Sequence, residues 1–124
     1  MQKKVLIVED NDNNMLLMRY LLESSGVEVI EAKTGLEGIQ QAHKNEADLI
    51  IMDIHLPDFS GINVTQKIRE FNKDVPIVAI TACALPGDKE KAIKAGFTKY
   101  LTKPIDPNRI DSEIAQFFTT DPPS

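Results

Sequence analysis

The sequence contains a single cysteine, Cys83, and therefore cannot form a disulfide within one chain. A lack of disulfides is typical of proteins in reducing compartments. No apolar run approaches the roughly 20 residues that a membrane-spanning helix needs, so no membrane partner is expected. Gln2-Lys3-Lys4 leads directly into a short apolar run, which differs from the long apolar stretch of a signal peptide. We therefore expect a cytoplasmic protein.

The chain is also short of positive charge. Its 14 lysines and arginines are outnumbered by 19 aspartates and glutamates, which gives a net charge of −5. Nucleic-acid binding needs a basic surface, so nucleic acid is not an expected partner. The 124 residues fit one domain that can bury an adequate core. We expect this domain over residues 1–119, a disordered polar tail over residues 120–124, and a monomer or weak dimer.

Short apolar runs alternate with helical patterns along the whole sequence. The predicted strands cover residues 5–8, 27–31, 49–52, 76–80 and 97–101. The predicted helices cover residues 12–25 and 88–95, and three more begin at residue 34, at residue 60 or 61, and at residue 106. Continuous apolar strands are typical of parallel sheets buried on both faces. The alternation predicts an α/β fold with a five-stranded parallel sheet and helices on both faces.

Polar residues directly follow the predicted strands. They are Glu9, Asp10, Asp53, Thr81 and Lys103. In parallel sheets of this kind, the carboxyl ends of the strands form the functional edge. Three carboxylates meeting there would raise one another's pKa, and we expect a divalent cation to compensate their charge. An all-oxygen donor set predicts Mg²⁺, with Mn²⁺ as a substitute.

Four segments of the chain carry a family resemblance. They are residues 5–11 (VLIVEDN), residues 48–57 (DLIIMDIHLP) with Gly61 after them, residues 80–82 (ITA), and residues 101–105 (LTKPI). In this order and spacing they resemble the receiver domains of two-component response regulators, over essentially the whole chain. The resemblance implies the flavodoxin-like (βα)5 receiver fold and a phosphoacceptor function. It implies a histidine kinase or a histidine phosphotransfer protein as the phosphodonor, and a downstream protein target.

The resemblance also assigns roles to the carboxylates. Asp53 matches the nucleophile that takes a phosphoryl group from a phosphohistidine. Asp10 and Asp53 match direct Mg²⁺ ligands, together with the backbone carbonyl of His55. Glu9 matches an acidic position that reaches the metal through water.

Further roles follow from the same resemblance. Lys103 matches the lysine that pairs with a phosphoryl oxygen, and Thr81 matches the hydroxyl that hydrogen-bonds another. Tyr100 occupies the position of a switch aromatic residue that moves with Thr81. His55 and Cys83 lie two residues beyond Asp53 and Thr81, where side chains flank the path of the hydrolytic water. The chain is therefore expected to catalyse only its own phosphorylation and dephosphorylation.

The first predicted helix has more apolar residues than one buried stripe needs. Leu17 and Leu21 are predicted to face the core, which leaves Met15 and Leu22 on another side. We interpret Met15 and Leu22 as a docking patch for the phosphodonor. The resemblance extends this patch to Pro104 and Ile105, in the loop after the last strand.

Other functions are weighed against this interpretation. A phosphatase of the haloacid dehalogenase type needs an acid two residues after its nucleophile, where this chain has His55. A flavodoxin needs a phosphate-binding loop after the first strand, and the acidic run after Val8 would repel a phosphate. A receiver that serves only as a structural interaction module remains open. So do a phosphorelay intermediate and a receiver excised from a larger regulator or hybrid kinase, although Met1 directly before the first strand favours a stand-alone switch.

Overall fold

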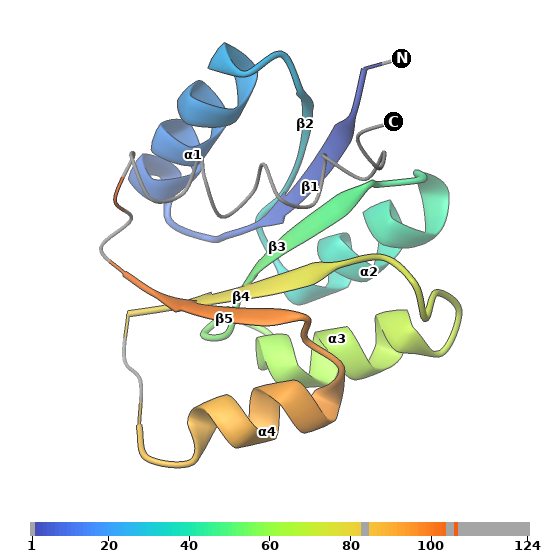
Figure 1. Ribbon diagram of the computed structural model, residues 1–124, viewed down its shortest axis with the longest axis vertical. Helices are drawn as coiled ribbons and strands as arrows, with labels where there is room; N and C mark the ends of the chain where they lie inside the picture. Colours follow the sequence, from blue (N-terminus) through green and yellow to red (C-terminus); the bar gives the residue numbers. More distant parts are fainter. Residues whose placement is uncertain (1, 83–84, 104–105, 107–124) are drawn as a thin grey trace, which may run out of the picture.

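The computed structural model describes residues 2–82, 85–103 and 106. Five strands form one sheet: β1 (Lys4–Val8), β2 (Glu28–Ala32), β3 (Leu49–Asp53), β4 (Ile77–Thr81) and β5 (Lys99–Thr102). Every neighbouring pair is parallel, and the strand order is β2-β1-β3-β4-β5 (Figure 1). The predicted parallel sheet is confirmed, with strand ends that shift by one or two residues. Pro76 precedes β4 because it has no N–H to donate, although its carbonyl accepts from the Ile50 N–H.

Four helices lie within the described residues: α1 (Asp12–Ser24), α2 (Gly35–Lys44), α3 (Gly61–Arg69) and α4 (Asp88–Ala95). The first three begin after polar N-caps, which are Asn11, Thr34 and Ser60. Helix α4 ends at Gly96, whose φ of 114° is a left-handed value that favours glycine. The predicted fifth helix and the predicted tail lie outside the described residues, apart from Asp106.

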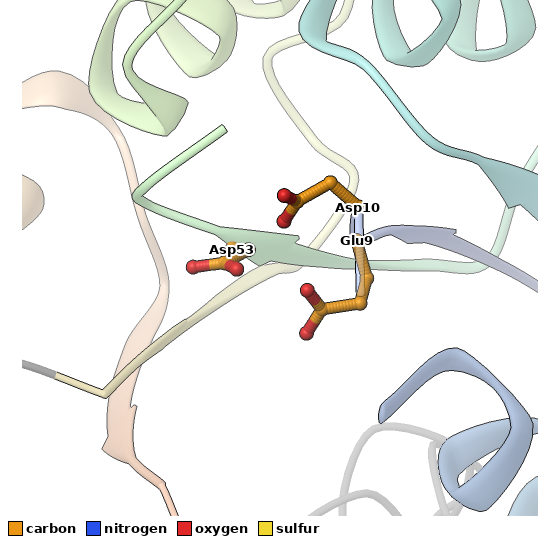
Figure 2. A group of neighbouring side chains, drawn as sticks. All are labelled: Glu9, Asp10 and Asp53. Carbon is orange, nitrogen blue, oxygen red and sulfur yellow. The ribbon is translucent and has the colours of Figure 1, made fainter. Parts of the chain in front are cut away.

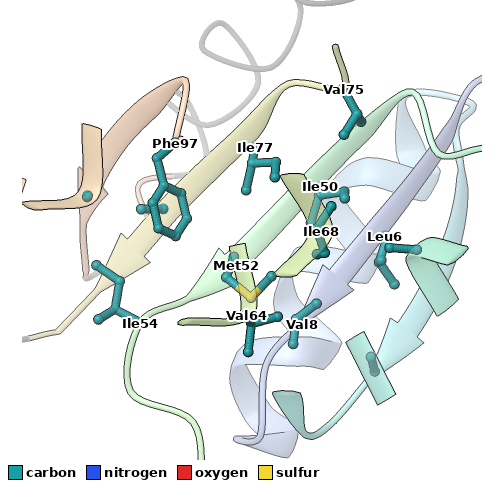
Figure 3. Packing of buried hydrophobic residues seen from close by; sticks show 14 residues of the cluster. Leu6, Val8, Ile50, Met52, Ile54, Val64, Ile68, Val75, Ile77 and Phe97 are labelled. Carbon is teal, nitrogen blue, oxygen red and sulfur yellow. The ribbon is translucent and has the colours of Figure 1, made fainter. Parts of the chain in front are cut away.

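Helices cover both faces of the sheet (Figure 1). Side chains of alternate strand residues point to opposite faces, so Leu6 and Val8 contact one layer while Val5 and Ile7 contact the other. Helices α2, α3 and α4 pack over the face that holds Leu6 and Val8, where the cluster in Figure 3 fills the interior. Helix α1 packs over the opposite face. Burial on both faces explains why the central strands β1, β3 and β4 are almost continuously apolar.

The buried stripe of α1 differs from the prediction. Met15 and Leu22 are 3% and 2% exposed and pack with Met18 against the sheet. Residues 15, 18 and 22 follow the i, i+3, i+7 spacing of a single helix face, so this stripe, and not the one through Leu17, faces the core. Leu17 is exposed and Leu21 is half-buried. The prediction that Met15 and Leu22 form an exposed docking patch is therefore wrong.

The strand order reverses at β1: the chain continues from β1 to β2 on one side of it and then crosses to β3 on the other side. β1 pairs with β2 on one side and with β3 on the other, and Val8 pairs with Met52. The residues that follow β1 and β3 therefore emerge side by side at the carboxyl edge. Within the described residues, no helix is long and apolar enough to cross a membrane.

Candidate functional site

Three carboxylates converge at the carboxyl edge of the sheet. Glu9 and Asp10 follow β1, and Asp53 is the last residue of β3. Figure 2 shows their side chains gathered around a common space, and one carboxylate oxygen from each residue lies within 4.8 Å of the others. Asp10 is exposed, whereas Glu9 and Asp53 are buried. A compact set of charged oxygen donors with one open side fits a hard divalent cation such as Mg²⁺.

Lys103, just beyond β5, reaches into this cluster. Its Nζ lies 2.8 Å from Glu9 Oε1 and 3.2 Å from Asp53 Oδ2. Its backbone N–H donates to the Thr81 carbonyl at 2.8 Å, which ties the residue to the end of β4. Part of the carboxylate charge is therefore compensated by an ammonium group. The divalent cation expected from the sequence would therefore share the compensation of charge with Lys103.

Burial and neighbouring charges shift the pKa values of Glu9 and Lys103. Burial raises the pKa of Glu9, and the negative charge of Asp53 adds to the rise, while Lys103 and the Asn11 N–H oppose it. Burial alone would lower the pKa of Lys103, but contacts with Glu9 and Asp53 raise it above its ordinary value. The ammonium form of Lys103 is therefore stabilised by the two carboxylates. The net effect of the surroundings of Glu9 is to raise its pKa and so to oppose its ionisation.

The loop between β3 and α3 holds Asp53 in place. The His55 N–H donates to Asp53 Oδ1 at 3.1 Å, and the Gly61 N–H donates to the Ile54 carbonyl at 2.7 Å. A Cβ at Gly61 would lie only 2.3 Å from the Asp53 carbonyl oxygen, so this close approach requires glycine. The loop therefore fixes both the backbone and the carboxylate of Asp53.

Three of the remaining predicted site residues, Thr81, Tyr100 and His55, lie in the described part of the chain. Thr81 ends β4 directly after Ile80, the residue that pairs with Asp53, and is fully buried. Tyr100 in β5 is half-buried and packs against the cluster beneath α2, α3 and α4. His55 is exposed. Cys83, Pro104 and Ile105 lie outside the described residues.

An opening beside the carboxylates gives access to the site. It has a volume of about 490 Å³ and lies between the loop after β3 and the start of α4. Asp10, His55, Leu85 and Lys91 are among the residues that line it. The exposed side of the cluster is therefore accessible to another molecule from this direction.

The sequence analysis missed two features near the site. Asp58, in the loop after β3, accepts hydrogen bonds from the first backbone N–H groups of α2. No local sequence pattern predicts this contact, because Asp58 and the first turn of α2 are far apart in the sequence. The exposed apolar residues of α1 were also missed, because the helix was assigned the wrong inward stripe: Leu16 and Tyr20 are 68% and 69% exposed.

Comparison with known sequences defines the class of this protein. Residues 5–115 match the profile of the response regulator receiver domain, and the chain belongs to this family. The polar-differentiation response regulator DivK of Brucella ovis is 41% identical over 119 residues, covering 94% of this chain and 97% of DivK. The DivK protein of Brucella abortus (strain 2308) matches to the same extent. The chain is therefore a receiver domain related to DivK.

Solved structures share the same architecture. A CheY-like receiver domain protein from Methanospirillum hungatei superposes with a TM-score of 0.90 at 27% identity, covering 94% of this chain and 93% of that one. The receiver domain of sensor histidine kinase PA1611 from Pseudomonas aeruginosa has a TM-score of 0.88 at 32% identity, covering 97% and 100%, and contains a magnesium ion in its active site cleft. The Saccharomyces cerevisiae receiver domain of Ssk1, solved with the phosphotransfer protein Ypd1, has a TM-score of 0.86 at 34% identity, covering 94% and 88%.

Proposed function

We propose that this chain is a phosphoacceptor response regulator in which Asp53 takes a phosphoryl group from a histidine kinase or a histidine phosphotransfer protein. The observation that carries the proposal is the convergence of Glu9, Asp10 and Asp53 around one space, with Lys103 Nζ against two of them. Family membership supports it, since the matched positions include all of these residues.

A bound Mg²⁺ would screen the negative charges of the phosphoryl group and the carboxylates as they approach one another. Asp10, Asp53 and the backbone carbonyl of His55 would hold it directly, and Mn²⁺ would substitute for it. Glu9 would act through water, because its Oε1 already pairs with Lys103 and its Oε2 accepts from the Asn11 N–H. The magnesium in the PA1611 receiver domain supports this assignment.

The transfer itself is a displacement at phosphorus. A carboxylate oxygen of Asp53 forms the new O–P bond while the P–N bond to the donor imidazole breaks, and that electron pair returns to the imidazole nitrogen. The His55 N–H holds the other Asp53 oxygen, which leaves one oxygen oriented for attack. The Lys103 ammonium then pairs with the phosphoryl oxygens in place of the Asp53 carboxylate. The Thr81 hydroxyl donates to a second phosphoryl oxygen.

The signal leaves through binding surfaces that depend on phosphorylation. Movement of Thr81 toward the phosphoryl group opens space beside β5, and Tyr100 turns inward to fill it. The resulting surface of α4 and β5 binds a downstream protein target more tightly in the phosphorylated form. Equal affinity of the target for both forms would instead favour a phosphorelay intermediate. The protein acts in the cytoplasm as a monomer or weak dimer.

Phosphodonor docking uses the exposed face of α1. Leu16, Leu17 and Tyr20, here called the α1 patch, replace the buried Met15 and Leu22 in this role. The patch lies on the helix that begins directly after the carboxylates of β1. An apolar patch beside the site fits the helical surface of a phosphotransfer protein, and the Ypd1–Ssk1 complex supports a partner of this class.

Two measurements test the proposal. Phosphotransfer from a radiolabelled phosphohistidine protein should require Mg²⁺ and should disappear in Asp53→Asn. Leu16→Asp should slow transfer from the protein donor while leaving phosphorylation by a small acyl phosphate unchanged. Leu36→Asp, at a similarly exposed leucine on α2, is the matched control and should change neither reaction. Transfer to Asp53→Asn at the parent rate would refute the function, and equal effects at Leu16 and Leu36 would refute the docking face.

A further inference from the structure

One carboxylate fastens the loop after β3 to a neighbouring helix. The Gly35 N–H donates to Asp58 Oδ1 at 2.7 Å, and the Leu36 N–H donates to Asp58 Oδ2 at 2.9 Å. Both N–H groups belong to the first turn of α2, where amides have no partner within the helix. Asp58 therefore caps a helix that precedes it in the chain, and at the same time pins the loop that follows Asp53.

The contact has little room for other side chains. A Cβ at Gly35 would lie 2.7 Å from Val64 Cγ2 and 3.1 Å from Asp58 Oδ1, so glycine allows the loop to approach the helix. Burial alone would raise the pKa of Asp58, but the N–H groups of Leu36, Gly35 and Phe59 lower it below its ordinary value. The carboxylate form is thus held by fixed dipoles, including those at a helix N-terminus.

The other end of the loop is closed by backbone contacts. His55 and Ser60 form an antiparallel bridge, and the Gly61 N–H donates to the Ile54 carbonyl. His55, whose N–H donates to Asp53 Oδ1, lies at this closed base, between that hydrogen bond and its own carbonyl. Asp58 is at the tip. The loop is therefore anchored at its base, near His55, and at its tip, through Asp58. His55, two residues after Asp53, lies between β3 and the anchor at the tip.

We propose that Asp58 is a positioning residue for the Mg²⁺ site, because its contact with α2 holds the loop in the geometry that presents the His55 carbonyl. The inference deepens the proposed function and rests on it. A backbone ligand binds a cation well only when its peptide is held in the productive orientation. Release of the loop tip lets the peptide between His55 and Leu56, which carries the His55 carbonyl, depart from that orientation and weakens the cation site.

A simpler role for Asp58 is stabilisation of α2 alone. The chain offers a matched control, because Thr34 caps the same helix from its own side: its hydroxyl oxygen accepts from the Glu37 N–H at 3.1 Å. Thr34→Ala removes one helix cap and leaves the loop anchored. Asp58→Ala removes a helix cap and also the loop anchor. A role in α2 stability alone predicts the same behaviour for both variants.

The experiment compares Mg²⁺ affinity in the parent, Asp58→Ala and Thr34→Ala, by titration calorimetry on protein freed of metal with a chelator. Asp58→Ala should bind Mg²⁺ about tenfold more weakly, which is the effect typical of residues that orient metal ligands. Thr34→Ala should bind Mg²⁺ like the parent while losing thermal stability. Gly35→Ala, which forces the helix and Asp58 apart without changing the loop sequence, should weaken Mg²⁺ binding as Asp58→Ala does.

A second readout reports on the loop itself. The His55 amide resonance in the metal-free protein should shift and broaden in Asp58→Ala and remain unchanged in Thr34→Ala. Equal Mg²⁺ affinities in Asp58→Ala and the parent, or equal losses in Asp58→Ala and Thr34→Ala, would overturn the positioning role while leaving the proposed function intact. A parent protein that does not bind Mg²⁺ would overturn the metal-dependent function, and the role of Asp58 with it.

Discussion

Removal of the Lys103 ammonium should make the fold depend on Mg²⁺. In Lys103→Ala, the buried carboxylates of Glu9 and Asp53 lose the group that lies 2.8 and 3.2 Å from them. Deleting one partner of a buried ion pair leaves an uncompensated charge, which typically costs about 3–5 kcal/mol. The Lys103 side chain is 13% exposed, and Asp10, the third carboxylate of the cluster, is exposed to solvent. The low end of that range, about 3 kcal/mol, is therefore expected.

This loss is large enough to measure by thermal unfolding. For a domain of this size, 1 kcal/mol corresponds to about 4 °C in Tm, so metal-free Lys103→Ala should melt about 12 °C below the parent. Mg²⁺ should then raise its Tm more than that of the parent. The reason is that the three carboxylates around the cation no longer share an ammonium, so the cation binds more tightly, and tighter binding to the folded state adds stability by linkage.

The assay is circular dichroism melting of each variant with a chelator and with saturating Mg²⁺. Lys103→Arg keeps the positive charge and should lose less stability. Lys33→Ala breaks an exposed ion pair with Asp12, at 2.9 Å, and should change the stability very little, because solvent screens exposed pairs. If metal-free Lys103→Ala and Lys33→Ala have the same Tm, or if Mg²⁺ raises the Tm of all variants equally, then Lys103 does not compensate the negative charge of the cluster.

Three further predictions concern stability. Asp53→Asn should raise the Tm of the metal-free protein, because the charge of three carboxylates exceeds that of the Lys103 ammonium and because Asp53 raises the pKa of Glu9. A Tm lower than that of the parent would contradict this prediction. Arg69→Met should lose about 1–3 kcal/mol in urea unfolding, because its guanidinium donates to the Gly96 and Asn72 carbonyls, and an unchanged unfolding midpoint would refute the contribution. The pKa of Asp58 is lowered below 3.8, so the stability it contributes is present above that value and is lost as the pH falls through its folded-state pKa. The Tm difference between the parent and Asp58→Ala should therefore be full at pH 6 and should shrink as the pH falls below 3.8; a difference independent of pH would show that the carboxylate charge is irrelevant.

The sheet and the carboxylate cluster could be predicted because their signals are local. The central strands β1, β3 and β4 are short, nearly continuous apolar runs, and their carboxyl ends carry polar residues. The edge at which Glu9, Asp53 and Thr81 meet then follows from the parallel arrangement, which brings the carboxyl ends of neighbouring strands together. Helix starts at Thr34 and Ser60 were similarly readable from their caps.

The errors have physical causes that a pattern does not contain. Helix α1 has apolar residues on more than one side, so its sequence allows two inward stripes, and only packing against the sheet selects Met15 and Leu22. The contact between Asp58 and α2 joins segments that are distant in the sequence, so propensity cannot reveal it. The pairing of Lys103 with Glu9 depends on the side-chain conformation at the edge.

The central claim is that Asp53 receives the phosphoryl group, and the most direct measurement locates that group. The protein is incubated with a small acyl phosphate and Mg²⁺, and the modified chain is analysed by intact mass and by peptide mapping. The account predicts one added phosphoryl group on the Asp53 carboxylate. No group should be added when a chelator replaces Mg²⁺ in the reaction, or when the protein is Asp53→Asn. A phosphoryl group on another residue, or equal labelling of Asp53→Asn, would contradict it.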